Sequence, residues 1–272
     1  MSPAHRVKSL ARRIDFGFGR FGISPLTSIR NAWGVPYFLR NKREIQRQYQ
    51  HSGKEFPFSS LYPCLGDRFE SGGVTSGHYF HQDLHVAQLI HARQPERHVD
   101  VASRIDGFVA HVASFVPVEV LDIRPAATSA RNITFRQTDL MQVPFALTAS
   151  TSSLSCLHGL EHFGLGRYGD PVDYDGYRTA WEHLTSMVTA GGFFYFSVPI
   201  GSQRIEFDAH RVFSVPFLME TMIEPSFSVA SFAFVDDAGE IHFDEDPRSP
   251  AAAVSFGCRY GCGIFELIKN QA

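Results

Sequence analysis

The chain has few cysteines, no internal repeat and no long apolar run. Its cysteines, Cys64, Cys156, Cys258 and Cys262, are too few and too scattered for a disulfide framework in a chain of 272 residues. No apolar run approaches the roughly 20 residues that cross a bilayer, and the N-terminus lacks the apolar core of a secretory signal. We therefore expect a cytoplasmic protein.

Only one pair of cysteines is close in sequence. Cys258 and Cys262 are four residues apart in a segment that otherwise has the pattern of a strand. The sequence has no second pair and no nearby histidine to complete a zinc site there. We therefore expect buried free thiols at these positions and no metal site.

Apolar residues are plentiful, in contrast. Hydrophobic residues make up 44% of the chain, which includes 25 Phe and 22 Gly. Such a chain can bury one large core, with a small appendage besides, and this composition is typical of a compact enzyme-like domain.

Charge is divided unevenly along the chain. Residues 1–54 contain 11 Lys and Arg against two Asp and Glu, whereas residues 55–272 contain 14 against 26. The acidic body and the lack of a recognised binding module argue against a nucleic-acid partner.

The basic N-terminus has the pattern of an amphipathic helix. Basic residues flank apolar ones that recur at helical spacing, namely Val7, Leu10, Ile14 and Phe18. This pattern predicts peripheral contact of residues 1–22 with the inner face of a membrane. The alternative is that the apolar stripe packs on the acidic body or on a second copy in a homodimer.

Residues 1–77 are expected to form a basic helical extension and a loop, and residues 78–272 an α/β domain. Pro36 can occupy the first turn of a helix that reaches about Gln50. A loop rich in Gly, Ser and Pro then leads to a helix over His78–Arg93, which we expect to lie against the sheet.

From Arg97 onward, short apolar strands alternate with helical stretches. The expected strands are His98–Ser103, Val118–Ile123, Ile133–Asp139, Ser152–His158 and Phe193–Pro199. Such β-α-β repetition predicts a parallel sheet with right-handed crossovers. Two long strands, Phe227–Val235 and Val254–Ile268, follow as a closing antiparallel pair.

Two motifs in this region carry a family resemblance. CLHGLEH ends the fourth expected strand, and TAGGFFYFSVP enters the fifth. With the order of elements, they resemble the class I S-adenosylmethionine-dependent methyltransferases over about residues 97–268. The resemblance implies a seven-stranded Rossmann-like α/β sheet ending in an antiparallel hairpin, and S-adenosylmethionine as cofactor.

Three further motifs make the resemblance narrower. SRIDGF, HGLEHFGLGRYGDP and FDAHRVFS resemble an uncharacterised methyltransferase-like family associated with bacterial surface-polysaccharide synthesis. This resemblance implies methyl transfer to a sugar or glycan hydroxyl, with a small molecule or a glycan as the acceptor.

The first strand ends in a turn that departs from the glycine-rich pattern of the larger family. Asp100 is retained and Gly107 lies nearby, but Ala102 and Arg104 stand where glycines are expected. The resemblance assigns Asp100, Ser103, Arg104 and Gly107 to cofactor binding. The missing glycines keep open a noncatalytic role of the same fold, as a binding or scaffolding protein.

Later strand ends supply the other expected cofactor contacts. The resemblance implies that Asp122 accepts hydrogen bonds from the ribose hydroxyls, and that Asp139 contacts the adenine amino group. Leu140 can pack on the ring, and His158 ends the fourth strand within the same group. A turn or cap role is the structural alternative for each acid.

The reacting side is expected in the turn after the fourth strand and in FDAHR. Glu161, His162 or His210 could take a proton from an acceptor hydroxyl. The residues expected to bind a phosphate or carboxylate of the substrate are Arg167, Tyr168 and Arg211. Alternatively, His162 packs or donates to backbone.

Histidine clusters leave a metal-using enzyme as a third possibility. His158, Glu161 and His162 with Asp170 include suitable ligand types. A second set falls on one face of a predicted helix, at His78, His81 and His85. A polar surface that faces solvent or lines a cleft, with Gln82 nearby, is the simpler interpretation of that face, so we expect no metal.

Overall fold

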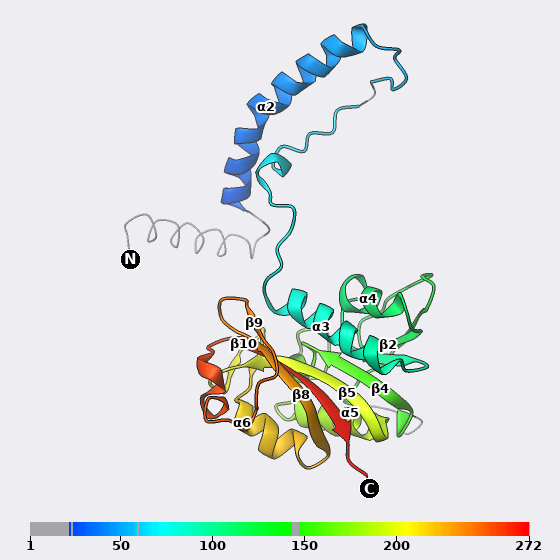
Figure 1. Cartoon of the computed structure of the whole chain (residues 1–272), viewed down its shortest axis with the longest axis vertical. Coiled ribbons are helices and arrows are strands. Elements are labelled where there is room, and N and C mark those ends of the chain that lie inside the picture. Colours follow the sequence, from blue (N-terminus) through cyan, green and yellow to red (C-terminus); the bar gives the residue numbers. More distant parts are fainter. Residues whose placement is uncertain (1–21, 23, 59, 143–146, 272) are drawn as a thin grey trace. The chain divides into compact units, whose positions relative to one another are not determined.

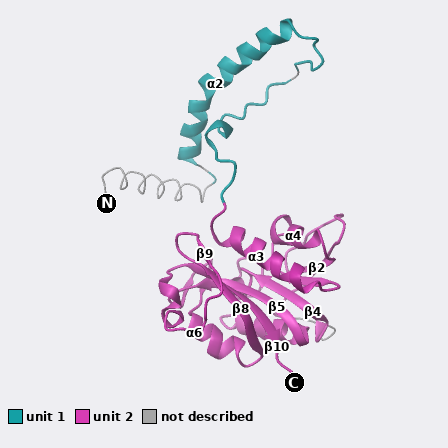
Figure 2. Cartoon of the chain, viewed as in Figure 1, with its two compact units in different colours: residues 1–74 teal, residues 75–272 magenta. Residues whose placement is uncertain are grey.

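A computed structural model of the chain describes residues 22, 24–58, 60–142 and 147–271 (Figure 1). The chain falls into two compact units, Met1–Val74 and Thr75–Ala272 (Figure 2). The amphipathic segment predicted over residues 1–22 lies outside the described residues, apart from Gly22. None of the helices in the described ranges combines the length and the apolar character of a membrane span.

Unit 1 contains a long helix whose start differs from the prediction. Helix α2 (Pro25–Gln50) begins after Ser24, whose side chain accepts a hydrogen bond from the Thr27 backbone N–H at 3.3 Å. Pro36, predicted at the start, lies inside the helix. The prediction was wrong because a serine cap followed by Pro25 in the first turn starts the helix earlier.

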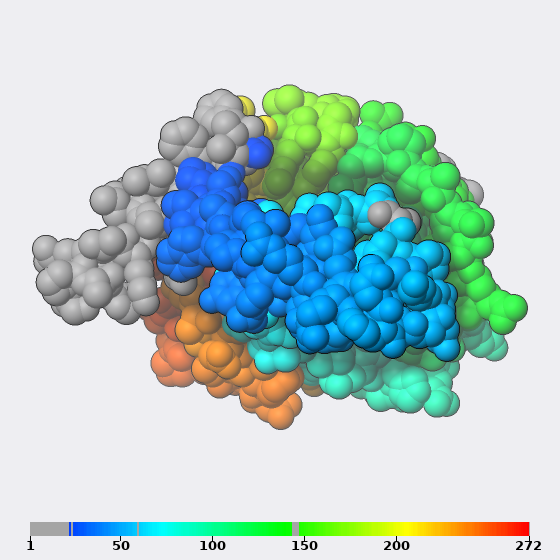
Figure 3. Space-filling view, turned by 90° about the horizontal axis from the view of Figure 1, so that it is seen from above, coloured from blue at the N-terminus to red at the C-terminus, as the bar shows by residue number. Residues whose placement is uncertain are grey.

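An extended segment returns beside α2 within unit 1, as Figures 1 and 3 show. It contains one short turn, η1 (Asp67–Phe69). The ring of Phe69 meets that of Tyr37 edge-on at 6.1 Å between centroids. Arg30 of α2 forms a 2.8 Å ion pair with Glu70, so aromatic and charged contacts both hold the return segment to the helix.

Unit 2 is built on one twisted sheet of eight strands in the order β3-β2-β1-β4-β5-β10-β8-β9. Its strands are β1 (His98–Val101), β2 (Val118–Asp122), β3 (Ile133–Gln137), β4 (Thr151–Leu157), β5 (Val188–Ile200), β8 (Phe227–Val235), β9 (Ile241–His242) and β10 (Gly261–Lys269). The first five are mutually parallel, and β10 runs antiparallel between β5 and β8. A parallel α/β sheet with an antiparallel end was predicted.

Two details of the predicted sheet were wrong. The sheet has eight strands, not seven, because the short β9 pairs with β8 through Phe234 and Val235. The last strand starts at Gly261 instead of Val254, because the preceding residues form a 3-10 turn, η6 (Ala252–Gly257). A separate hairpin, β6 (Arg204–Glu206) with β7 (His210–Val212), follows β5.

Helices cover both faces of the sheet (Figure 1). One core joins α3 (His78–Arg93) and α4 (Ala110–Ala113) to the sheet, with Ile90 and Phe108 fully or almost fully buried. The helices of the other core are α5 (Gly176–Met187), α6 (Val215–Phe217) and the turn Leu218–Ile223. The prediction that residues 78–93 form a helix against the sheet is confirmed.

The order of the strands determines where a ligand can bind. From β1 the chain adds β2 and β3 on one side of the sheet, then returns to add β4 and β5 on the other side. Parallel sheets of this kind bind ligands outside the carboxyl ends of the strands, where the direction of strand addition reverses. In this chain that point lies between β1 and β4.

Candidate functional site

A cavity of about 580 Å³ lies at this reversal point. Its walls come from the loops after β1, β2 and β4, from Leu140 after β3, and from one face of α3. The volume is within the range of small-molecule sites. The cavity therefore gathers residues from four strand ends that are far apart in sequence.

The loop after β1 keeps a tight turn without its expected glycine. Ala102 adopts a positive φ of 66°, a conformation that favours glycine. Gly159 in the loop after β4 packs against this turn, and a Cβ there would lie 3.2 Å from that of Ala102. The two loops thus approach each other closely at the base of the cavity.

Asp100 does not line the cavity, contrary to expectation. Its carboxylate accepts hydrogen bonds from the backbone N–H and hydroxyl of Ser103, at 3.1 and 2.8 Å. It also accepts from the Ser155 hydroxyl at 2.5 Å. Burial raises the pKa of Asp100 to about 6, although these hydrogen bonds favour its charged form. The residue fixes the turn, while Ser103 and Gly107 line the cavity.

Arg104 leaves the cavity open. Its guanidinium pairs with Asp106 at 2.7 Å, and its side chain is 75% exposed. Both residues lie on the rim among the lining residues. The bulky residue at an expected glycine position therefore points toward solvent.

Asp122 reaches the cavity, as predicted, but already has a partner. Arg124 donates to its carboxylate from the backbone at 2.8 Å and from Nε and Nη2 at 3.0 and 2.5 Å. The guanidinium of Arg124 also lies over the Tyr168 ring, at 4.6 Å. Arg124 was not predicted, because nothing in the sequence indicates that its side chain folds back on Asp122.

Asp139 and Leu140 both follow β3, but only Leu140 lines the cavity. Leu140 is buried and lines the cavity, as predicted. Asp139 does not line it, because its Oδ1 accepts a hydrogen bond from the Met141 backbone N–H at 2.9 Å within its own turn. The structural alternative, a turn-forming acid, therefore applies to Asp139.

His158 and Glu161 form a buried pair just after the end of β4. Nδ1 of His158 donates to Oε1 of Glu161 at 2.7 Å, and the two side chains are 3% and 1% exposed. Burial by itself would lower the pKa of His158. The electrostatic fields of Cys262 and Glu161 outweigh burial and raise this pKa well above its ordinary value. Glu161 faces inward and does not line the cavity, so the structure does not support its role as a base.

His162 faces the cavity in a form suited to accept a proton. Its Nδ1 lies 2.7 Å from the backbone carbonyl of Ala209. Because a carbonyl can only accept, Nδ1 carries the hydrogen and Nε2 of the neutral ring holds a lone pair. Burial lowers the pKa of His162, despite the opposing field of Glu161. The neutral ring is therefore the principal form at neutral pH.

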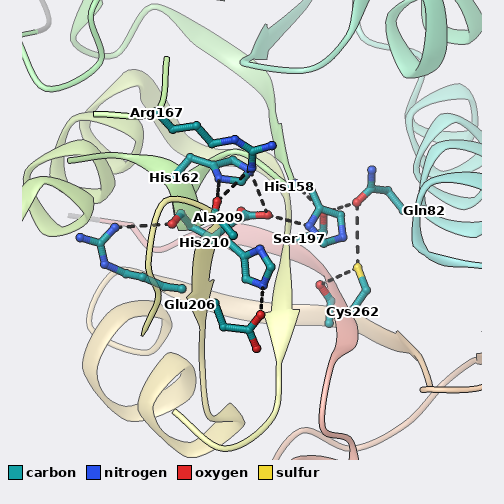
Figure 4. Close-up of polar contacts among 12 residues, drawn as sticks. Gln82, His158, His162, Arg167, Ser197, Glu206, Ala209, His210 and Cys262 are labelled. Atoms are coloured by element: carbon teal, nitrogen blue, oxygen red, sulfur yellow. Dashed lines mark hydrogen bonds and ion pairs between the residues drawn. The ribbon is translucent and has the colours of Figure 1, made fainter. Parts of the chain in front are cut away.

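The hairpin after β5 folds back to this turn and contributes its backbone, not the predicted side chain of His210. The Ala209 carbonyl accepts from both His162 and Arg167, the latter at 3.0 Å (Figure 4). His210 does not line the cavity. Its Nε2 faces Glu206 at 3.5 Å, and its ring lies against Tyr260, so its predicted role as a base lacks support.

Two of the three predicted substrate-binding residues reach the cavity. Arg167 and Tyr168 line it and stack together, with the guanidinium 5.1 Å from the ring centroid. Arg211 is buried and donates to the carbonyls of Phe163 and Tyr174 at 2.7 and 2.9 Å. It anchors the backbone of the turn and is unavailable to a ligand.

Helix α3 contributes the remaining wall through Tyr79, Gln82 and Asp83. None of the histidines of the predicted face, His78, His81 and His85, lines the cavity, although Gln82 near them does. Asp83 was missed, although its spacing from Tyr79 places both on one helix face. Burial raises the pKa of Asp83. Its Oδ2 lies close to Gly107 in the loop after β1, since a Cβ added to Gly107 would be 3.2 Å from it.

A family model described as DUF268, a Caenorhabditis protein of unknown function, matches residues 126–240, less than half of the chain. No curated protein matches the chain.

Several solved structures have similar folds at low identity. N-methyltransferase NodS from Bradyrhizobium japonicum WM9, in complex with S-adenosylhomocysteine, is 12% identical over 72% of this chain and 89% of its own, with a TM-score of 0.49. The 1,6-didemethyltoxoflavin-N1-methyltransferase of Burkholderia thailandensis, with its substrate and S-adenosylhomocysteine bound, is 14% identical over 70% and 79%, with a TM-score of 0.48. The [4+2]-cyclase SpnF is 11% identical over 69% and 82%, also at 0.48. At this level, similarity assigns no activity to the chain.

Proposed function

We propose that the cavity binds S-adenosylmethionine and that the protein transfers its methyl group to an acceptor. The observation that carries this proposal is Asp122, a carboxylate at the tip of β2 in a cavity at the reversal point of the sheet. A carboxylate is suited to accept hydrogen bonds from two ribose hydroxyls. Leu140 would pack against the adenine ring, and Ser103 and Gly107 would face the amino-acid end.

The bound cofactor would supply an electrophilic methyl group. Transfer from a sulfonium is an in-line displacement, so alignment of the acceptor provides most of the catalysis. His162 would take the proton of an acceptor hydroxyl at Nε2, while its Nδ1–H remains fixed on the Ala209 carbonyl. The Ala209 carbonyl thus sets both the tautomer and the orientation of the base.

The acceptor proposed here is a sugar or glycan hydroxyl of surface-polysaccharide synthesis in the cytoplasm. Arg167 and Tyr168 at the cavity supply a cation and an aromatic face. An arginine fork matches a phosphate or carboxylate, and an aromatic face accepts the apolar side of a sugar ring. These residues support an anionic or glycosidic acceptor, and the narrower resemblance supplies the pathway.

The test is calorimetric titration of the full chain with S-adenosylhomocysteine. Asp122→Asn should weaken binding at least about tenfold, because charge-assisted hydrogen bonds contribute about 1.5–3 kcal/mol. Asp139→Asn is the matched control, since Asp139 lies outside the cavity wall, and its affinity should be that of the unmodified protein. Equal effects of the two variants, or no binding to the unmodified protein, would refute the proposal.

The pairing of Asp122 with Arg124 favours a second candidate, a noncatalytic protein of the same fold. Three hydrogen bonds from Arg124 already occupy this carboxylate. If Asp122 binds the ribose hydroxyls, Arg124 must first release it. The side chain of Arg124 is partly exposed and has room to move. The variant Arg124→Ala distinguishes the two proposals. If it binds S-adenosylhomocysteine as tightly as the unmodified protein or more tightly, the enzyme is supported. If neither protein binds it, the noncatalytic role is supported.

A further inference from the structure

Three side chains with metal-ligating atoms meet beside the cavity wall. They come from distant segments: His78 begins α3, His158 follows β4, and Cys262 lies in β10. One ligand atom from each lies within 4.8 Å of the other two. Figure 4 shows His158 and Cys262 on the same side of the sheet, next to Gln82.

One of these atoms is a buried nitrogen without a partner. Nε2 of His158 has no hydrogen-bond partner among the described residues, and its side chain is 3% exposed. The other ring nitrogen is held by Glu161 at 2.7 Å. A carboxylate on one nitrogen and a metal on the other is the usual arrangement of a histidine ligand. His158 is therefore oriented toward a ligand that it lacks within the protein.

His78 lies beside His158 at the start of α3. Its ring hydrogen-bonds to the backbone of Tyr260. The ring stacks on that of His158, with centroids 5.2 Å apart and planes 5° from parallel, so one ring must turn before both lone pairs can meet at one ion.

Cys262 completes the cluster with a poorly satisfied sulfur. Its Sγ approaches Gln82 Oε1 and the Gly263 carbonyl, each at 3.9 Å, and the residue is fully buried. A Cys–His–Glu set also resembles a nucleophilic triad. A nucleophile must meet its substrate, however, whereas Cys262 has no exposed surface, so the nucleophilic interpretation is the weaker one.

We propose that His78, His158 and Cys262 bind one zinc ion. Two imidazole nitrogens and a thiolate are the donors that zinc prefers, and three protein ligands leave a fourth position for water or another group. Zinc bond lengths place tetrahedral ligands about 3.4–3.6 Å apart, so the 4.8 Å cluster must contract by roughly 1 Å.

Such a site would join three parts of unit 2 and does not depend on methyl transfer. It would fix the first residue of α3 to the ends of β4 and β10. Because His158 also lines the cavity, the ion would hold one wall of the candidate cofactor site in place. The sequence places the two histidines in separate ligand sets and does not join them to Cys262, because they lie 104 and 184 residues before it.

The test is metal titration of the full chain after chelator treatment, with cobalt(II) as a spectroscopic probe and zinc in competition. We expect one equivalent of metal and a sulfur-to-cobalt charge-transfer band. Cys262→Ser should abolish the band, and His78→Ala should weaken zinc binding at least about tenfold, by analogy with losses around zinc sites.

The matched controls are Cys258→Ser, a second buried cysteine outside the cluster, and His85→Ala on the same helix. Both should bind metal like the unmodified protein. Circular dichroism checks the folding of each variant, and if Cys262→Ser does not fold, His78→Ala still decides the question. Failure to bind a full equivalent, or equal binding by His78→Ala and its control, would overturn the proposal. S-adenosylhomocysteine is absent throughout, so this result is separate from that of the proposed function.

Discussion

At the scale of single residues, local hydrogen bonds decide which predicted side chains can act. Glu161 and His162 are adjacent in the chain, yet only His162 faces the cavity. The Glu161 carboxylate turns inward to His158, which leaves His162 as the better-placed base.

His162→Gln should lower turnover about 10²–10⁴-fold if His162 is the general base, because that is the usual contribution of such a group. S-adenosylhomocysteine affinity should stay within about twofold, since a base acts on the acceptor. Methyl transfer to an accepted substrate and calorimetry measure the two effects. The control is again Asp139→Asn, because Asp139 lies outside the cavity wall. Equal turnover in His162→Gln and the control would remove His162 from this role.

A second residue-scale feature is a buried polar chain between β1 and β4. The ring of His98 contacts the hydroxyls of Ser153 and Ser155 at 2.8 and 2.9 Å, and Ser155 continues to Asp100. Burial lowers the pKa of His98 to about 3. The folded state thus keeps this ring neutral.

His98 should make the protein sensitive to acid. An unfolded histidine titrates near pH 6.5, so below that pH the unfolded state binds the proton first, and stability falls by up to about 1.4 kcal/mol per pH unit toward pH 3. Asp100, with its raised pKa, acts in the opposite direction between about pH 6 and 3.8.

The difference between the unmodified protein and His98→Gln isolates this contribution. In denaturant unfolding from pH 7 to pH 4, the free energy of unfolding should fall less steeply in His98→Gln than in the unmodified protein. This holds even if the variant is less stable at pH 7. His91→Gln, which removes an exposed imidazole of α3, is the control. Parallel stability curves for His98→Gln and the unmodified protein would contradict the assignment.

At the scale of elements, α2 and its return segment depend on one glycine. Gly34 is the position where the backbone of Leu65 approaches α2, and a Cβ there would overlap the Leu65 carbonyl oxygen. Gly→Ala inside a helix ordinarily stabilises it by about 1 kcal/mol. Here the return segment would have to move away, and overpacking costs about 1–3 kcal/mol.

Gly34→Ala should therefore release the return segment without unfolding unit 2. Limited proteolysis followed by mass spectrometry should show faster cleavage within residues 51–74. Gly53→Ala is the matched control, because the nearest atom to its added Cβ is 4.0 Å away. Cleavage at the same rate in both variants would show that the close approach at Gly34 is unimportant.

Elements with a strong local signal were predictable. Helix α3 and strand β8 have the predicted bounds, since apolar periodicity is regular in both. The start of α2 differs from the prediction because Ser24 caps the helix well before Pro36. The first residues of the predicted last strand form a turn instead, with positive φ at Ser255 and Phe256, which no apolar pattern reveals.

At the scale of the whole molecule, the parallel sheet with its antiparallel end could be predicted, but not every partner at the strand ends. Asp100 lies in β1, Asp122 ends β2 and Asp139 follows β3, and only Asp122 lines the cavity. Hydrogen bonds hold Asp100 to Ser103 and Ser155, and they hold Asp139 to its own turn. The meeting of Cys262 with two histidines depends on the antiparallel placement of β10 beside β5, a contact between distant segments.

The most direct test of the central claim is a crystal structure of the full chain with S-adenosylhomocysteine. We predict the nucleoside in the cavity between the ends of β1 and β4, with its ribose hydroxyls within hydrogen-bond distance of Asp122 and Arg124 moved aside. A ligand bound elsewhere, or a cavity in which Arg124 still holds Asp122 at saturating ligand, would contradict it.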